Sequence, residues 1–173
     1  MSLAAGDLPD GLILCPVSGQ IESYLQHLQA DGSSSYEVTN AQWAKLKRAG
    51  ATAGWVQSYA QNPDDCAARL GERKGQSAIS FAIRFRDATA ASAGFSAGFL
   101  GLRPEEGMQI PGLARGSETQ LTPDSWTYDQ TDKVPPVFVA FWANRQFDLF
   151  LLTERLPAAT AQHSAFGMNG RVR

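Results

Sequence analysis

At 173 residues, with 43% hydrophobic and 18% charged side chains, the chain has the length and composition of one folded domain rather than of a disordered protein. Its 15 basic and 17 acidic side chains give a net charge of -2 without a basic stripe that would attract a phosphate backbone, so nucleic acid is not expected as a partner. No uncharged run is longer than that of residues 88–102, which is rich in Gly, Ala and Ser and shorter than the roughly 20 apolar residues of a spanning helix, so no membrane span is expected.

The chain has two cysteines, Cys15 and Cys66, and their separation fits no CxxC metal or redox motif. Two such cysteines form one disulfide in an oxidising compartment or stay as buried thiols in a reducing one, and their number does not choose between these states. The first residues have neither the cationic start nor the apolar stretch of a signal peptide. An export signal is therefore either absent or already removed.

Few side chains suit metal or acid–base chemistry. His27 and His163 are the only histidines, so no metal site and no cofactor are expected. The acidic pairs at 64–65 and 105–106 are expected to be solvated loop residues, because adjacent carboxylates in a loop rarely face one site.

The first part of the chain predicts short elements separated by turn residues. An apolar run bounded by a glycine and a proline indicates a strand at 12–15. Apolar residues at helical spacing indicate an amphipathic helix over 21–28. A loop at 31–35 precedes a helix at 40–49, which a Thr-x-x-Gln capping box opens. Alternating aromatic and polar residues then predict a strand at 55–59.

The clearest strand is 79–85, where apolar residues strictly alternate with smaller or polar ones. Asp87 is expected to cap a helix of small residues over 88–99 that could pack closely on a sheet. The segment from about 101 to 136 carries Pro and Gly at many positions. It is expected to be mostly irregular, with one strand near 118–121.

The last part of the chain predicts a hairpin of strands at 137–142 and 147–153 around the Asn-Arg pair at 144–145. Both strands are almost continuously apolar, which is typical of a central position buried on both faces. A final short helix at 158–166 follows a proline, which is tolerated in a helix's first turn.

The order strand, strand, helix occurs twice, in 55–99 and in 137–166. We therefore expect one α+β domain over 1–173: an antiparallel sheet with helices mainly on one face, in the pattern of a degenerate ββα duplication. In such a duplication the helices of both units would pack on the same face of the sheet.

Three segments carry a resemblance to known proteins: the Phe-Arg-Asp-Ala run at 85–88 that leads into an Ala-rich helix, the Ile-Pro-Gly-Leu run at 110–113, and the hairpin at 137–153. In these the chain resembles secreted bacterial lipoproteins and the extracellular sensor domains of membrane-bound Ser/Thr kinases. The resemblance covers roughly the last hundred residues. It implies an extracytoplasmic binding or sensing module without catalysis.

One motif points to catalysis instead. Residues 94–98 match the G-x-S-x-G nucleophile elbow of serine hydrolases, and Ser96, Asp148 and His163 follow one another in the hydrolase order. The elbow is a sharp turn directly between strand and helix, whereas here about eight helix-prone residues precede the first glycine. A small serine hydrolase is therefore kept only as an alternative.

The candidate binding residues lie in the long irregular segment. Trp126 and Tyr128 lie in this segment, where an aromatic side chain either packs at the edge of the core or contacts a binding partner. Arg103, Glu105 and Arg115 surround them in the sequence and could supply polar contacts to a ligand.

The sequence thus favours a non-enzymatic domain that binds or senses an unidentified small molecule or protein. An extracytoplasmic location is expected, with a cytoplasmic one as the alternative. The competing functions are the serine hydrolase and a structural or oligomerising subunit, and the sequence does not predict an oligomeric state.

Overall fold

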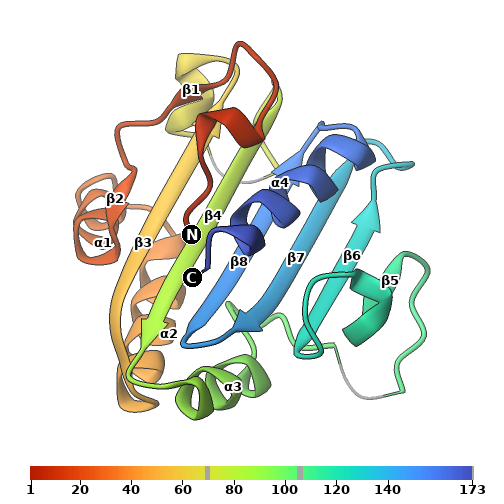
Figure 1. Ribbon diagram of the computed structural model, residues 1–173. Coiled ribbons are helices and arrows are strands. Elements are labelled where there is room, and N and C mark those ends of the chain that lie inside the picture. The colour runs from red at the N-terminus through yellow and green to blue at the C-terminus, as the bar shows by residue number, and fades with distance from the viewer. Residues whose placement is uncertain (69–70, 105–106, 173) are drawn as a thin grey trace.

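The computed structural model describes residues 1–68, 71–104 and 107–172, and within them the chain forms one antiparallel sheet in the order β1-β3-β4-β8-β7-β6-β5, with β2 paired to β3 (Figure 1). The strands are β1 (Ile13–Leu14), β2 (Gly19–Gln20), β3 (Ala51–Ala60), β4 (Ser77–Phe85), β5 (Leu113–Arg115), β6 (Ser125–Gln130), β7 (Val137–Asn144) and β8 (Phe147–Glu154). The helices are α1 (Ile21–Ala30), α2 (Ser35–Arg48), α3 (Ala88–Ala97) and α4 (Ala158–Gly170), with 3-10 turns η1 (Ala5–Asp7), η2 (Pro63–Cys66) and η3 (Gly116–Thr119).

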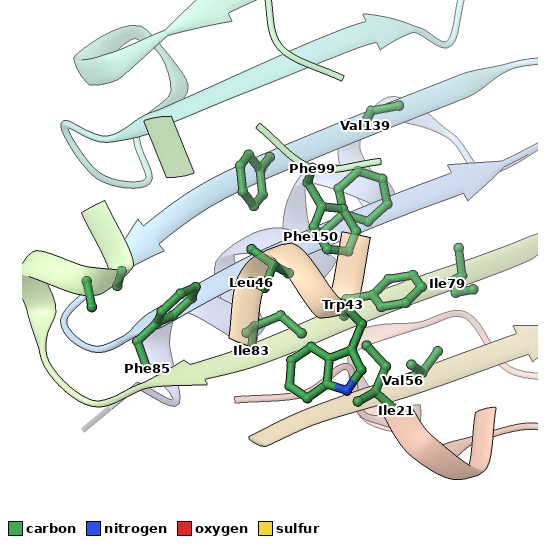
Figure 2. Packing of buried hydrophobic residues seen from close by; sticks show 14 of the residues in the cluster. Ile21, Trp43, Leu46, Val56, Ile79, Ile83, Phe85, Phe99, Val139 and Phe150 are labelled. Atoms are coloured by element: carbon green, nitrogen blue, oxygen red, sulfur yellow. The ribbon is translucent and has the colours of Figure 1, made fainter. Parts of the chain in front are cut away.

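The helices α1, α2 and α3 cover one face of the sheet, and we call the core beneath them the first core. Its buried members are Ile21, Leu25, Trp43, Leu46, Val56, Ile79, Phe81, Ile83, Phe85, Ala90, Ala91, Phe99, Trp126, Val139, Phe141 and Phe150. Figure 2 shows Phe99, which follows α3, against Phe150 of β8, with ring centroids 4.9 Å apart. The expected α+β fold with helices mainly on one face is confirmed.

The second face is covered by α4 and by the N-terminal turn η1, both of which lie on the side of the sheet toward the viewer in Figure 1. The core beneath them contains Leu3, Tyr59, Ala78, Ala82, Phe138, Ala140, Trp142, Phe147, Leu149, Leu151, Ala161, Ala165, Met168 and Val172. Arg171, directly after α4, donates from Nη1 to Asp7 Oδ1 over 2.8 Å and forms an ion pair with this buried carboxylate. Ser164 Oγ donates to the Asp7 carbonyl over 2.7 Å, so the chain's two ends are joined.

The strands of the proposed duplication are arranged as two hairpins, β3–β4 and β7–β8, which meet along β4 and β8 with Phe81 opposite Phe150. The helices do not follow this symmetry, because α3 packs on the first face and α4 on the second. On the first face, the position that a repeat would give to α4 is taken by α1 and α2, which pack over β3. On the second face, β7 and β8 also carry apolar side chains, in agreement with their predicted burial on both faces. Helix α4 covers these side chains.

Several predicted elements differ from those of the structure: β3 begins at Ala51 rather than at 55, and α4 extends to Gly170 rather than ending at 166. Helix α2 begins at Ser35 rather than at residue 40, so Thr39 is a buried residue inside the helix and not its cap. The segment 101–136 contains two strands, β5 and β6, and the predicted strand at 118–121 is instead part of η3 and the turn after it. The period-2 pattern of β6, with Trp126 and Tyr128 on one face, was present in the sequence but was hidden by the Pro and Asp residues around it.

Cys15 and Cys66 lie at disulfide distance, with 2.06 Å between their sulfur atoms, and join the end of β1 to η2.

Asp65, next to Cys66, was expected to be a solvated loop residue but is buried. It is 4% exposed and accepts hydrogen bonds from the backbone N–H groups of Lys74 and Gly75 at 3.0 and 2.8 Å. These bonds, which favour the charged form, hold the pKa of the Asp65 carboxyl below its usual value. Within the described ranges, no helix is long and apolar enough to cross a membrane.

Candidate ligand-binding groove

The floor of the candidate site is the first face of the sheet at its β5–β6–β7 edge. Leu113, Tyr128 and Val139 are paired across the three strands and form one transverse row. Trp126 lies in the next row opposite Phe141, and their rings make an edge-to-face contact at 6.1 Å. Since side chains two positions apart share a sheet face, Trp126 and Tyr128 present adjacent aromatic surfaces to this edge.

The wall of the groove is the loop that follows α3. Gly98 ends α3 with a φ of 78°, and a Cβ there would lie 2.8 Å from the Cβ of Arg103, so the loop can fold back only against a glycine. Phe99 and Leu102 then pair through two backbone hydrogen bonds of 3.2 and 2.8 Å. On the far side, Arg115 Nη1 donates to the Pro104 carbonyl over 3.2 Å and ties the loop to β5.

The groove between floor and wall has a volume of about 290 Å³, at the small end of ligand pockets, which span roughly 300–1,000 Å³. Its lining consists of Gly101, Leu102, Arg103, Pro104, Ile110, Leu113, Trp126, Tyr128 and Val139. Leu102 and Ile110 at its rim are 41% and 37% exposed, and Met108 beside them is 41% exposed. Large apolar side chains gathered at one surface hollow mark a binding site more often than scattered ones do.

The structure therefore brings together three of the four predicted binding residues, Arg103, Trp126 and Tyr128. Arg115 does not line the groove but holds its wall, and Glu105 lies outside the described residues. The sequence missed Leu102, Ile110 and Leu113. Their signal was a set of isolated apolar residues between prolines and glycines, which has no period that would reveal a shared surface.

The three residues of the hydrolase alternative are not brought together. Ser96 is exposed in the last turn of α3, on the first face, whereas His163 is exposed on α4, which covers the second face. Asp148 is buried on β8 beneath Gly94, which is two helix positions away from Ser96 and so on a different side of α3. Ser96 also lacks the strand-to-helix turn that exposes a nucleophile.

Both glycines of the G-x-S-x-G match have a packing role. A Cβ at Gly94 would lie 2.5 Å from Asp148 Oδ2 and from the Phe85 ring, so glycine allows α3 to approach the sheet. The second, Gly98, ends the helix and admits the groove wall, as described above. The motif is explained by helix packing and termination.

Asp148 is the most perturbed ionisable group in this region. It is 2% exposed, and neither carboxyl oxygen has a hydrogen-bond partner among the described residues. Burial, with a smaller contribution from the charge of Asp124, raises its pKa to about 8. Asp124 itself accepts a hydrogen bond from Ser92 Oγ over 2.8 Å.

No group of three or more His, Cys, Asp or Glu side chains in the described part of the chain could hold a metal ion. No protein-family model, curated protein or solved structure matches the chain. The geometry of the groove is therefore the basis on which a function can be assigned.

Proposed function

We propose that the chain is a non-enzymatic, extracytoplasmic domain that binds a small apolar molecule in the groove at the β5–β6–β7 edge. The observation that carries the proposal is the joint presence of a Trp126–Tyr128 aromatic floor and exposed apolar rim residues around one hollow. An aromatic or short aliphatic compound fits a volume of about 290 Å³, whereas a folded protein partner would contact only its rim.

The side chains around the groove also suggest the ligand's polarity. The walls are apolar except for Arg103, whose side chain is exposed, and the Tyr128 hydroxyl. A ligand with an apolar body and at most one weakly polar group would bury its surface without leaving a buried polar group unpaired. The apolar area removed from water would be its main source of affinity.

The extracytoplasmic location is supported by Cys15 and Cys66 lying at disulfide distance, since disulfides persist mainly in oxidising compartments. Thiol counting on the denatured, unreduced protein tests this part: no free thiol is expected. Two free thiols in protein isolated from its native compartment would contradict the location and leave the groove unaffected.

Calorimetric titration with indole, naphthalene and octanol tests the binding function. Leu102→Glu places a charge on the groove rim at an exposed position, so it should weaken binding about tenfold or more by desolvation of the carboxylate while the fold is retained. The matched control is Val38→Glu, which changes an exposed apolar residue on α2 that does not line the groove. Equal affinities of both variants, or no binding of any probe, would contradict the proposal.

Light scattering over a tenfold dilution separates this function from that of an oligomerising subunit. A ligand-binding domain with a free groove keeps one mass across the dilution. A mass that falls on dilution, and that Leu102→Glu reduces to the monomer's, would show instead that the apolar rim is a subunit interface.

A further inference from the structure

A second cavity lies on the first face at the opposite end of the sheet, between the α1–α2 turn and the segment carrying Cys66. Its volume is about 320 Å³. The lining residues are Val17, Tyr24, Leu28, Asp31, Gly32, Ser33, Ser35, Ser58, Cys66, Ala67, Ala68, Arg73 and Ile79. It shares no residue with the groove described above.

The feature that distinguishes this cavity is a buried cation, Arg73, which is 5% exposed. Its Nη2 donates to Ser58 Oγ over 3.3 Å and its Nε to the Ala68 carbonyl over 3.4 Å, both long bonds. Its Nη1 is buried and has no hydrogen-bond partner among the described residues. Arg73 thus brings to the cavity wall a guanidinium whose hydrogen-bonding capacity is only partly used.

Among the described side chains, Arg73 has no counter-ion at contact distance. No carboxylate within the described ranges lies within 4.0 Å of the Arg73 guanidinium. The charges of Glu154 and Asp65 act on Arg73 from beyond that distance, and both groups accept hydrogen bonds elsewhere: Glu154 from Ser77 Oγ over 3.1 Å and from Gly71 N–H, and Asp65 from the two backbone N–H groups described above. An anion that makes direct hydrogen bonds to the guanidinium would therefore add a contact pairing that Arg73 lacks among the described residues.

A second group of donors faces the same cavity from α1 and α2. Ser35, the first residue of the 14-residue helix α2, lines it together with Ser33 of the preceding turn. The positive end of the α2 dipole therefore borders the cavity, although the Ser35 N–H donates to Ser33 Oγ and the Tyr36 N–H donates to the Ser33 carbonyl. Tyr24 of α1 also lines the cavity, and its hydroxyl makes no hydrogen bond to any described residue.

The remaining walls restrict the anion's chemistry. Val17, Leu28 and Ile79 give the cavity apolar walls, and 320 Å³ is more space than a bare oxyanion needs. Asp31 also lines it, and its like charge opposes a dianion such as a phosphate monoester more strongly than a monoanion. We propose that this cavity binds a small organic acid, with its carboxylate on Arg73 and its apolar body against Leu28 and Ile79.

The test uses benzoate, its neutral analogue benzamide, and inorganic phosphate, each titrated into the intact protein and followed by NMR of the backbone amides. Benzoate should produce saturable shifts at Gly32 and Ser33, whereas benzamide should not, because the carboxylate supplies the pairing with Arg73. This comparison needs no variant and so does not depend on how a substitution affects folding.

Two variants locate the effect. Arg73→Gln should weaken benzoate binding about tenfold or more, while Lys74→Gln, which removes the same charge from the exposed neighbouring position, should leave it within about twofold. Ser35→Glu puts a carboxylate at the exposed cavity rim, at a helix terminus that accepts one well, and should also abolish benzoate binding.

The proposal is overturned if benzoate and benzamide bind equally, if neither binds, or if benzoate binds wild type and Ser35→Glu alike. Phosphate binding in the absence of benzoate binding would also overturn it, because the cavity would then be selective for a different class of anion.

Discussion

Replacing the buried Asp148 by Asn gives the sharpest test of the packing beneath α3. In the native state this carboxyl is held between β8 and Gly94 without a hydrogen-bond partner, and its pKa is raised to about 8. Asn has the same shape and stays neutral at every pH. The substitution therefore removes the ionisation while the volume of the side chain is retained.

The direction of the pH effect follows from the two states of the protein. The unfolded chain releases the Asp148 proton near the ordinary aspartate pKa of 3.8, whereas the native chain keeps it until about pH 8. Between these values the unfolded state binds fewer protons, so the free energy of unfolding falls as the pH rises and levels off above about 8. At about 1.4 kcal/mol per pKa unit, the shift corresponds to a loss of roughly 6 kcal/mol for a rigid site.

Urea denaturation of wild type and Asp148→Asn at a series of pH values from 4 to 9 measures this term. The two proteins should have similar stability near pH 4, and the variant should become the more stable by several kcal/mol at pH 8.5. Asp10→Asn, at an exposed position, is the control and should follow wild type. A difference between Asp148→Asn and wild type that does not change with pH would refute the account of a carboxyl kept neutral by burial.

Three further substitutions test other parts of the fold. Replacing Cys15 and Cys66 together by Ser removes a link across 51 positions, which should lower the free energy of unfolding by about 4 kcal/mol in urea and make it insensitive to dithiothreitol. Gly94→Ala should lower the melting temperature by an amount equivalent to about 1–3 kcal/mol, because its Cβ would lie 2.5 Å from Asp148 Oδ2, and a stabilised variant would contradict that close approach. Asp7→Asn removes the charge of the ion pair between the N-terminal turn and the end of α4, and should cost about 2 kcal/mol at pH 7 by calorimetry; an unchanged melting temperature would show that the pair is not formed.

The elements with a strong local signal could be predicted from the sequence. The alternation of 79–85 predicted β4, and Asp87 accepts a hydrogen bond from the Ala90 N–H over 2.8 Å as its predicted capping role requires. The nearly continuous apolar runs of β7 and β8 predicted burial on both faces. In each case a few neighbouring residues contain the whole signal.

What depends on distant contacts could not be predicted. The face chosen by α4 is decided by α1 and α2, which already cover the other face. The cavity beside Arg73 could not be predicted, because Glu72, Arg73 and Lys74 together have the composition of a solvated turn. The burial of Arg73 depends on segments far away in the chain. Trp126 and Tyr128, which were predicted to bind a ligand, line the groove, but their strand was not recognised.

The central claim is that the hollow beside Trp126 and Tyr128 binds a small apolar molecule. The most direct measurement is a titration of methyl-labelled protein with indole, read from the methyl signals of Leu102, Ile110 and Leu113. The account predicts saturable shifts at these three residues, with those of Leu149 and Leu151 in the opposite core unchanged. Indole shifts that are absent at the groove, or that are equally large in both cores, would contradict it.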